Sequence, residues 1–151
     1  MRVSLILLLA AFGLCVAPEA IAGTPKIPEG KAALSTQGTY ADKAVTVEKL
    51  NGKKVSMRAA ELFLAPGAHQ IELAFMWDLR PQEDKWVLYK TTRLTVTLNA
   101  EAGHTYMPNG NISATGVSGR FDDLGLNYNR DCLPRRRYTM SGKLKPECPD
   151  Y

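Results

Sequence analysis

The chain has 151 residues, a formal net charge of +4 and a sequence pI near 9.0. This length suits one domain of ordinary size and is too short for two comfortable ones. The basic pI permits weak attraction to anionic surfaces such as lipid headgroups, cell-wall polymers or nucleic acid, and by itself it demonstrates none of them.

The N-terminus has the pattern of a cleavable signal peptide. After an initial Met-Arg, residues 3–16 form an apolar run of about fourteen residues, whereas a membrane-spanning helix needs ~20. A run of this length is typical of a signal-peptide core. Pro18 then breaks the helix. Ala20 and Ala22 are small residues at the two positions that a signal peptidase reads, so the pattern predicts cleavage before Gly23.

Cleavage near Ala22-Gly23 would remove residues 1–22 as a signal peptide and leave no transmembrane helix in the mature chain. The expected location is then the periplasm or the secreted fraction. Two alternatives stay open. A lipoprotein acylated at Cys15 would need a small residue before that cysteine, and the sequence has Leu14 there. An uncleaved membrane anchor is the second alternative.

The first elements of the mature chain are defined by turn residues. Residues 23–31 contain two prolines and two glycines without a periodic apolar face, which predicts a flexible leader. A first strand is expected from Ala32 to about Tyr40. Residues 44–50 and 53–57 flank Asn51-Gly52, and both turn residues tolerate the positive φ of a type I′ turn. A tight antiparallel hairpin is therefore predicted there.

The middle of the chain carries the clearest alternation of apolar and polar residues. A short strand over residues 61–64 is expected to end at Ala65-Pro66-Gly67, a turn sequence. Residues 69–77 follow with a period of two, which predicts a half-buried strand. The residues on its apolar face are Ile71, Leu73, Phe75 and Trp77.

A second alternating strand is predicted over residues 86–98, after a charged, solvated loop at residues 78–85. The two strands pair naturally, because Leu94, Val96 and Leu98 share one face. A turn at residues 99–103 leads into a further strand that begins at His104 and that Pro108 is expected to interrupt. No amphipathic helix longer than about two turns is predicted anywhere.

Beyond residue 108 the sequence turns to glycine, asparagine and charge. Four glycines are expected to break any regular element there: Gly110, Gly116, Gly119 and Gly125. We therefore predict an all-β fold, a small antiparallel β-sandwich with an irregular, disulfide-closed C-terminal tail. Its core would span residues 32–108, and residues 109–151 would form a loop-rich basic tail of the same domain.

The cysteine count predicts one disulfide bond. Loss of the signal peptide removes Cys15 and leaves Cys132 and Cys148, and an even pair in an exported chain is most simply a disulfide. It would close a loop of about fifteen residues, which the chain-entropy estimate values at roughly 3 kcal/mol. The alternative is two free or metal-bound thiols, although no C-x-x-C motif or Cys/His cluster accompanies them.

Three segments resemble the PEGA-type exported β-domains and their uncharacterised bacterial relatives. They are Val47–Lys53, with an N-G-K turn; Leu62–Leu73, with a P-G-x-H corner; and Val96–Tyr106, with an "aG-x-x-Y" return. The resemblance implies a small β-sandwich at the cell envelope with no catalysis established for the group. It covers about residues 45–107, and the basic tail lies outside it.

No constellation of residues predicts an active site, a cofactor or a metal. His69 and His104 each follow a glycine-containing turn, and we expect turn-stabilising or surface roles for them. Asp122-Asp123 is the one carboxylate pair that could assist a metal, and no further ligands accompany it. A G-x-S-x-G elbow is absent, so we expect no enzyme activity.

The residues that could act at a surface are Arg135, Arg136 and Arg137, in a loop over residues 133–138 between the two cysteines. A disulfide-held arginine loop could clamp anionic groups or enter the acidic pocket of a trypsin-like protease. The alternative is a solvated basic turn. The sequence thus predicts a binding or structural role, with an envelope protein or an anionic cell-wall polymer as the possible partner and no nucleic acid.

Overall fold

The computed structural model describes residues 24–40, 43–78, 89–113 and 115–149. The predicted signal peptide and nearly all of the predicted loop at 78–85 lie outside the described residues. Within the described ranges, no helix has the length and apolar character required to cross a membrane.

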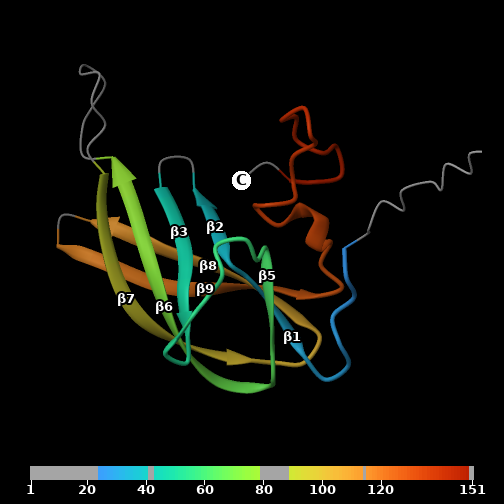
Figure 1. Cartoon of the computed structure of the whole chain (residues 1–151), viewed down its shortest axis with the longest axis horizontal. Helices are drawn as coiled ribbons and strands as arrows, with labels where there is room; N and C mark the ends of the chain where they lie inside the picture. The colour runs from blue at the N-terminus through green and yellow to red at the C-terminus, as the bar shows by residue number, and fades with distance from the viewer. Residues whose placement is uncertain (1–23, 41–42, 79–88, 114, 150–151) are drawn as a thin grey trace, which may run out of the picture.

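The described chain forms nine strands and one 3-10 turn, arranged as two layers (Figure 1). Sheet A has the order β5-β1-β8-β9, and sheet B has the order β2-β3-β6-β7 with β4 beside β3. All pairings among these strands are antiparallel except β1 with β8. The predicted all-β sandwich is confirmed. The elements are β1 Ala32–Ser35, β2 Gln37–Tyr40, β3 Lys43–Leu50, β4 Lys53–Lys54, β5 Glu61–Leu64, β6 Gly67–Asp78, β7 Tyr89–Ala100, β8 His104–Ser113, β9 Gly116–Leu126 and η1 Arg130–Cys132.

The predicted first strand is split between the two sheets. β1 lies in sheet A and β2 lies in sheet B, so the chain changes layer at Thr36. The Thr36 hydroxyl is buried and donates to the Ala59 carbonyl at 2.6 Å, and the Thr36 carbonyl accepts from the amide of Val47 at 2.9 Å. These bonds satisfy the backbone and side chain at the crossing, where no ladder continues.

The predicted turns take the expected conformations. Asn51 and Gly52 have φ of 48° and 79°, and they join β3 to β4 as a tight hairpin. Gly67 has φ of 115° and begins β6, directly after the predicted stop of β5 at Leu64. Local turn chemistry therefore defines this half of sheet B.

The core lies between the two sheets. Three residues of the predicted apolar face of β6 are buried, Ile71, Leu73 and Phe75, each at most 1% exposed, and the Trp77 side chain lies outside the described part. β6 and β7 pair in continuous register from Gly67–Ala100 to Asp78–Tyr89, which confirms the predicted pairing. Apolar burial of this kind contributes roughly 25 cal/mol per Å², so the buried face of β6 stabilises the sandwich.

The expectation that glycines end the regular structure after residue 108 is wrong. β8 continues to Ser113 and β9 runs through three of the four glycines, so the sandwich extends to Leu126. Gly110 and Gly119 are cross-strand partners that face sheet B. A Cβ at Gly119 would lie 2.8 Å from Cγ2 of Val96, and one at Gly110 would overlap the Phe75 ring. These two glycines let the layers approach closely.

Pro108 does not interrupt β8, where it pairs with Phe121 of β9. The register of β1 with β8 ends at Tyr106, so one edge of β8 carries no strand ladder beyond that residue. Proline is tolerated in a strand where no ladder hydrogen bond is lost.

The predicted flexible leader is docked on the tail. The Thr24 hydroxyl donates to the Asp131 carboxylate, and the Arg130 guanidinium donates to the Pro25 carbonyl. The sequence of residues 23–31 has no apolar pattern that could indicate this docking, because the partners are polar and lie more than 100 positions away.

Candidate functional site

The irregular tail is fastened to sheet A by a buried ion cluster. Glu61 on β5 has a side chain that is 3% exposed, and it accepts from Nη1 of Arg130 at 2.7 Å and from Nη1 of Arg136 at 3.0 Å. The Arg130 guanidinium also lies over the Phe63 ring, 5.7 Å from its centroid. A carboxylate buried to this degree requires such partners, so the cluster fixes where the tail sits.

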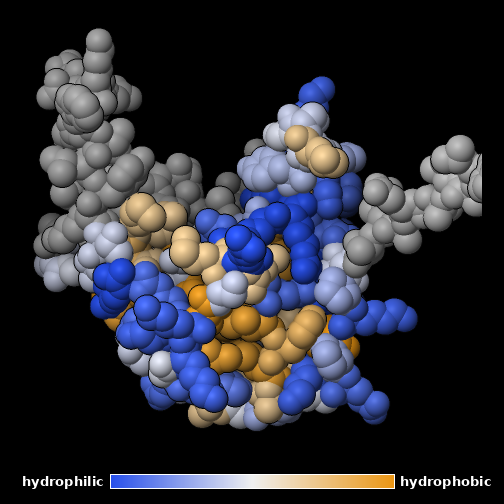
Figure 2. Space-filling model, in the orientation of Figure 1, coloured by the Kyte–Doolittle hydropathy of each residue, from blue (hydrophilic) through white to orange (hydrophobic). Residues whose placement is uncertain are grey.

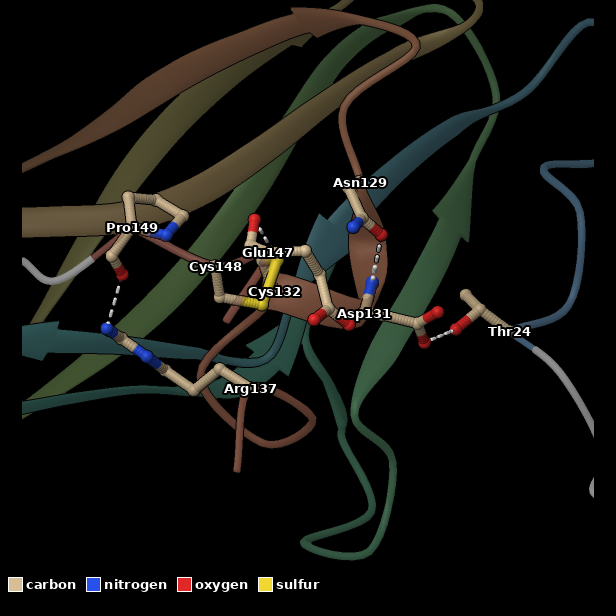
Figure 3. Close-up of a disulfide and its surroundings, with 8 residues drawn as sticks. All are labelled: Thr24, Asn129, Asp131, Cys132, Arg137, Glu147, Cys148 and Pro149. Carbon is tan, nitrogen blue, oxygen red and sulfur yellow. Dashed lines mark hydrogen bonds between the residues drawn. A yellow bond between two sulfur atoms is a disulfide. The ribbon is translucent and has the colours of Figure 1, made fainter. Parts of the chain in front are cut away.

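The predicted disulfide between Cys132 and Cys148 is confirmed (Figure 3), and Cys132 lies between the two arginines of the ion cluster in the sequence. The two Cα atoms are 5.1 Å apart. Asn129 precedes η1 and its side-chain oxygen accepts from the Asp131 amide at 3.1 Å, which caps the turn that carries Cys132. The disulfide closes most of the irregular tail that remains after β9 ends at Leu126.

Removal of the disulfide by Cys132→Ser with Cys148→Ser is expected to lower the free energy of unfolding by about 3 kcal/mol, because the unfolded chain regains the closed loop. Urea titration of the variant measures this loss, and the oxidised wild type is the reference. Amide exchange should rise in residues 127–149 more than in β6. An unchanged urea midpoint would show that the ion cluster alone holds the tail.

The arginine loop is divided between interior and surface. Arg137 is 1% exposed, and its guanidinium donates to the Pro149 carbonyl at 2.5 Å (Figure 3). Arg136 is bound to Glu61. Only Arg135 is exposed, and it donates to the Met57 carbonyl. The structure therefore does not gather the three guanidinium groups into one anion clamp.

A hollow of about 430 Å³ lies on sheet B where residues 54–57 and the tail meet β3. Its apolar lining includes Val55, Met57 and Met76, and the two methionines are 86% and 41% exposed. Figure 2 shows apolar residues gathered in the middle of this face, over the region between β3 and β5, with hydrophilic residues around them. We call this hollow the groove. Its volume is within the range of small-molecule sites.

The charged lining of the groove is predominantly positive. Glu48 is its one carboxylate, and it accepts two hydrogen bonds from Arg93, from Nε at 2.6 Å and from Nη2 at 3.1 Å. Lys49 is paired with Glu72 at 2.9 Å outside the lining. Lys54 and Arg135 have no carboxylate within ion-pair distance among the described residues. The groove thus offers two cations without a direct ion pair beside an apolar surface.

The hydrogen bonds from Arg93 lower the pKa of the Glu48 carboxyl below its ordinary value, and the charges of Arg93, Lys49 and Lys54 act in the same direction. A depressed folded-state pKa contributes stability that is present above the unfolded pKa and is lost as the pH falls through the folded pKa. We expect Arg93→Gln to raise the Glu48 pKa toward the ordinary value, as followed by carboxyl NMR titration. An unchanged pKa in Arg93→Gln would assign the depression to the lysines.

Sequence reasoning missed the groove. Its lining comes from separate segments, β3, β4, residues 55–57, β6, β7 and the tail, and no local motif links them. The available signal was weak: Met57 stands among polar residues after the hairpin, and Met76 stands on the polar face of an alternating strand.

One histidine stabilises a turn, and the other pairs with a carboxylate at the surface. His69 lies between Nδ2 of Asn51 at 3.1 Å and the Ala65 carbonyl at 2.7 Å, which confirms a turn-stabilising role. His104 lies 2.9 Å from a carboxylate oxygen of Asp123. Within the described ranges, no three His, Cys, Asp or Glu side chains are grouped to hold a metal ion.

Comparison with known proteins gives no relative: no protein-family model, curated protein or solved structure matches the chain.

Proposed function

We propose that this chain is an exported β-sandwich that binds a ligand outside the cytoplasm and does not catalyse a reaction. The ligand is one that carries a negatively charged group and an apolar part, and it occupies the groove on sheet B. The signal-peptide pattern of residues 1–22 and the Cys132–Cys148 disulfide support export, because disulfides persist in oxidising compartments.

The observation that carries the proposal is the combination of Met57 and Met76 with Lys54 and Arg135 in one hollow. Exposed methionine is a flexible apolar side chain that adapts to different ligand shapes. A nearby cation without a carboxylate partner attracts an anionic head group and orients the ligand. A ligand that satisfies both needs is amphiphilic, such as a lipid-derived acyl chain with a carboxylate or phosphate.

The groove is better suited to recognition than to catalysis. Its one carboxylate, Glu48, is held by two hydrogen bonds from Arg93, and its pKa lies below the range useful for proton transfer at neutral pH. The resemblance of the turn motifs to PEGA-type exported domains agrees with a β-sandwich at the envelope for which no catalysis is established. Arg135 keeps a part in anion recognition here, as one of the two groove cations without an ion pair.

Calorimetric titration with three probes tests the proposal. We expect decanoate to bind, decyltrimethylammonium, with the same chain and the opposite charge, to bind at least about tenfold more weakly, and heparin, which has charge without a chain, not to compete. Lys54→Glu should weaken decanoate binding because the cation becomes an anion, and Lys54→Glu with Arg135→Glu should abolish it.

The matched control is Lys26→Glu with Lys143→Glu, which changes the net charge equally at exposed positions away from the groove. It should bind decanoate like the wild type. If decanoate and decyltrimethylammonium bound equally well, the groove would not be selective for anions. If the control double variant lost as much decanoate affinity as the groove double variant, the binding site would lie elsewhere. Mass spectrometry of the exported protein tests the location separately: we expect Gly23 as the first residue and no alkylatable thiol.

A further inference from the structure

One edge of the sandwich differs from the other three. β2 and β5 are edge strands of four residues each, and β9 contains glycines and a register shift opposite Thr105 and Tyr106. β7 forms the fourth edge with twelve residues, no proline and unbroken register against β6. Proteins usually protect edge strands by shortness, bulges, proline or charge, because an open edge pairs with other strands. β7 is neither short, bulged nor broken by proline, and its charged residues are Lys90 and Arg93 alone.

The outer edge of β7 offers backbone groups for pairing. In an antiparallel pair, alternate residues direct their N–H and C=O groups toward the neighbour, and the rest direct them away. The neighbour of β7 in the sheet is β6 alone, and no backbone hydrogen bond from elsewhere in the described ranges reaches β7. A row of amides and carbonyls along residues 91–100 is therefore available to another strand.

The same side of the molecule exposes apolar side chains. Leu94 and Val96 on β7 and Val117 and Phe121 on β9 pack against the core and are only partly buried. β7 and β9 are the edges of the two sheets and face each other across the layers, since Gly119 of β9 lies against Val96. A line of partly buried apolar side chains thus lies beside the unpaired edge of β7, where the two layers approach closely.

We propose that β7 pairs antiparallel with β7 of a second copy of this chain, about a twofold axis at Thr95. Directly opposite residues in such a pair point to the same face, so the axis must pass through a residue position. An axis at Thr95 sets Leu94 opposite Val96 of the second copy on the apolar face. It sets Arg93 opposite Thr97 of the second copy, whereas an axis at Arg93 would oppose two arginines.

We assign a second copy of the chain as the partner of β7, because a β7–β7 pair places chemically compatible side chains opposite each other. Apolar side chains meet apolar side chains, threonines meet threonines or an arginine, and the twofold axis closes the assembly without leaving another β7 edge. The two five-stranded sheets would then become one continuous sheet.

Sedimentation velocity of the exported protein over a range of concentrations tests the pairing. We expect a dimer in the wild type, and we expect Thr95→Lys to weaken it by at least about tenfold, because two lysines would lie directly opposite each other. Thr95→Glu should weaken it equally. An equimolar mixture of Thr95→Lys and Thr95→Glu should recover the dimer, since lysine then opposes glutamate.

Ser118→Lys provides the matched control, because it adds the same charge to the exposed face of β9. It should leave the dimer intact. A wild type that stays monomeric at every concentration, a mixture that does not recover the dimer, or a Ser118→Lys protein as weak as Thr95→Lys would overturn the proposal. Far-ultraviolet dichroism shows whether each variant is folded, and the recovery arm distinguishes lost pairing from lost folding.

Discussion

Replacement of Glu61 by glutamine is expected to lower the free energy of unfolding by about 3–5 kcal/mol, the range measured when one partner of a buried ion pair is removed. Among the described residues, Glu61 is the one carboxylate paired with the buried Arg130 and with Arg136. A neutral amide leaves two guanidinium groups without their counter-charge next to sheet A. Urea or guanidinium titration measures the loss.

The control for Glu61→Gln is Glu72→Gln, the same chemical change in a more exposed pair with Lys49. Exposed pairs contribute at most about 1 kcal/mol. The tail should also loosen selectively in Glu61→Gln, with amide exchange rising in residues 127–149 before it rises in β6. If both variants lost the same small amount, Glu61 would not be the anchor of the tail.

Replacement of Gly110 by alanine is expected to cost about 3 kcal/mol or more. A Cβ there would overlap both the Phe75 ring and the carbonyl oxygen of Ser118, and the backbone of the paired strand cannot move aside. Gly119→Ala should cost less, about 1–3 kcal/mol, because its nearest neighbours are the side chains of Val96 and Leu94, which can shift.

Thermal or urea unfolding of the two glycine variants beside Ser118→Ala provides the comparison, since Ser118 is exposed on the same strand as Gly119 and should change stability by no more than about 0.5 kcal/mol. An order in which Gly119→Ala is the worse variant would mean that the layers separate more easily at Phe75 than the structure indicates.

Local patterns predicted much of sheet B. The Asn51-Gly52 turn and the Pro66-Gly67 corner depend on backbone conformations that few residues adopt, so the sequence reveals them directly. The period of two in β6 also identifies its buried face, because the face that meets the core carries the apolar residues. The disulfide followed from the cysteine count and the predicted export.

The rest depended on contacts between distant residues. Glu61 pairs with arginines 69 and 75 positions away, and nothing near Glu61 in the sequence indicates that it is buried. The run Arg135–Arg137 looks like a surface loop because its partners are invisible locally. Gly110 and Gly119 predict strand breaks from the sequence alone, because a glycine that ends a strand and a glycine that permits close packing cannot be told apart without the contacts.

The groove was unpredictable for a related reason. It exists only because the hairpin, two strands of sheet B and the tail converge, and the position of the tail depends on the Glu61 cluster. The predicted effects are therefore linked: a variant that releases the tail should also displace Arg135 from the groove and weaken ligand binding.

Amide and methyl NMR of the labelled protein during titration with decanoate tests the central claim most directly. The account predicts shift changes at Thr46, Val55, Met57 and Met76 that saturate together, with little change at Arg137 or along β8. Saturable changes confined to residues 133–138, or no saturable change at the groove, would contradict it.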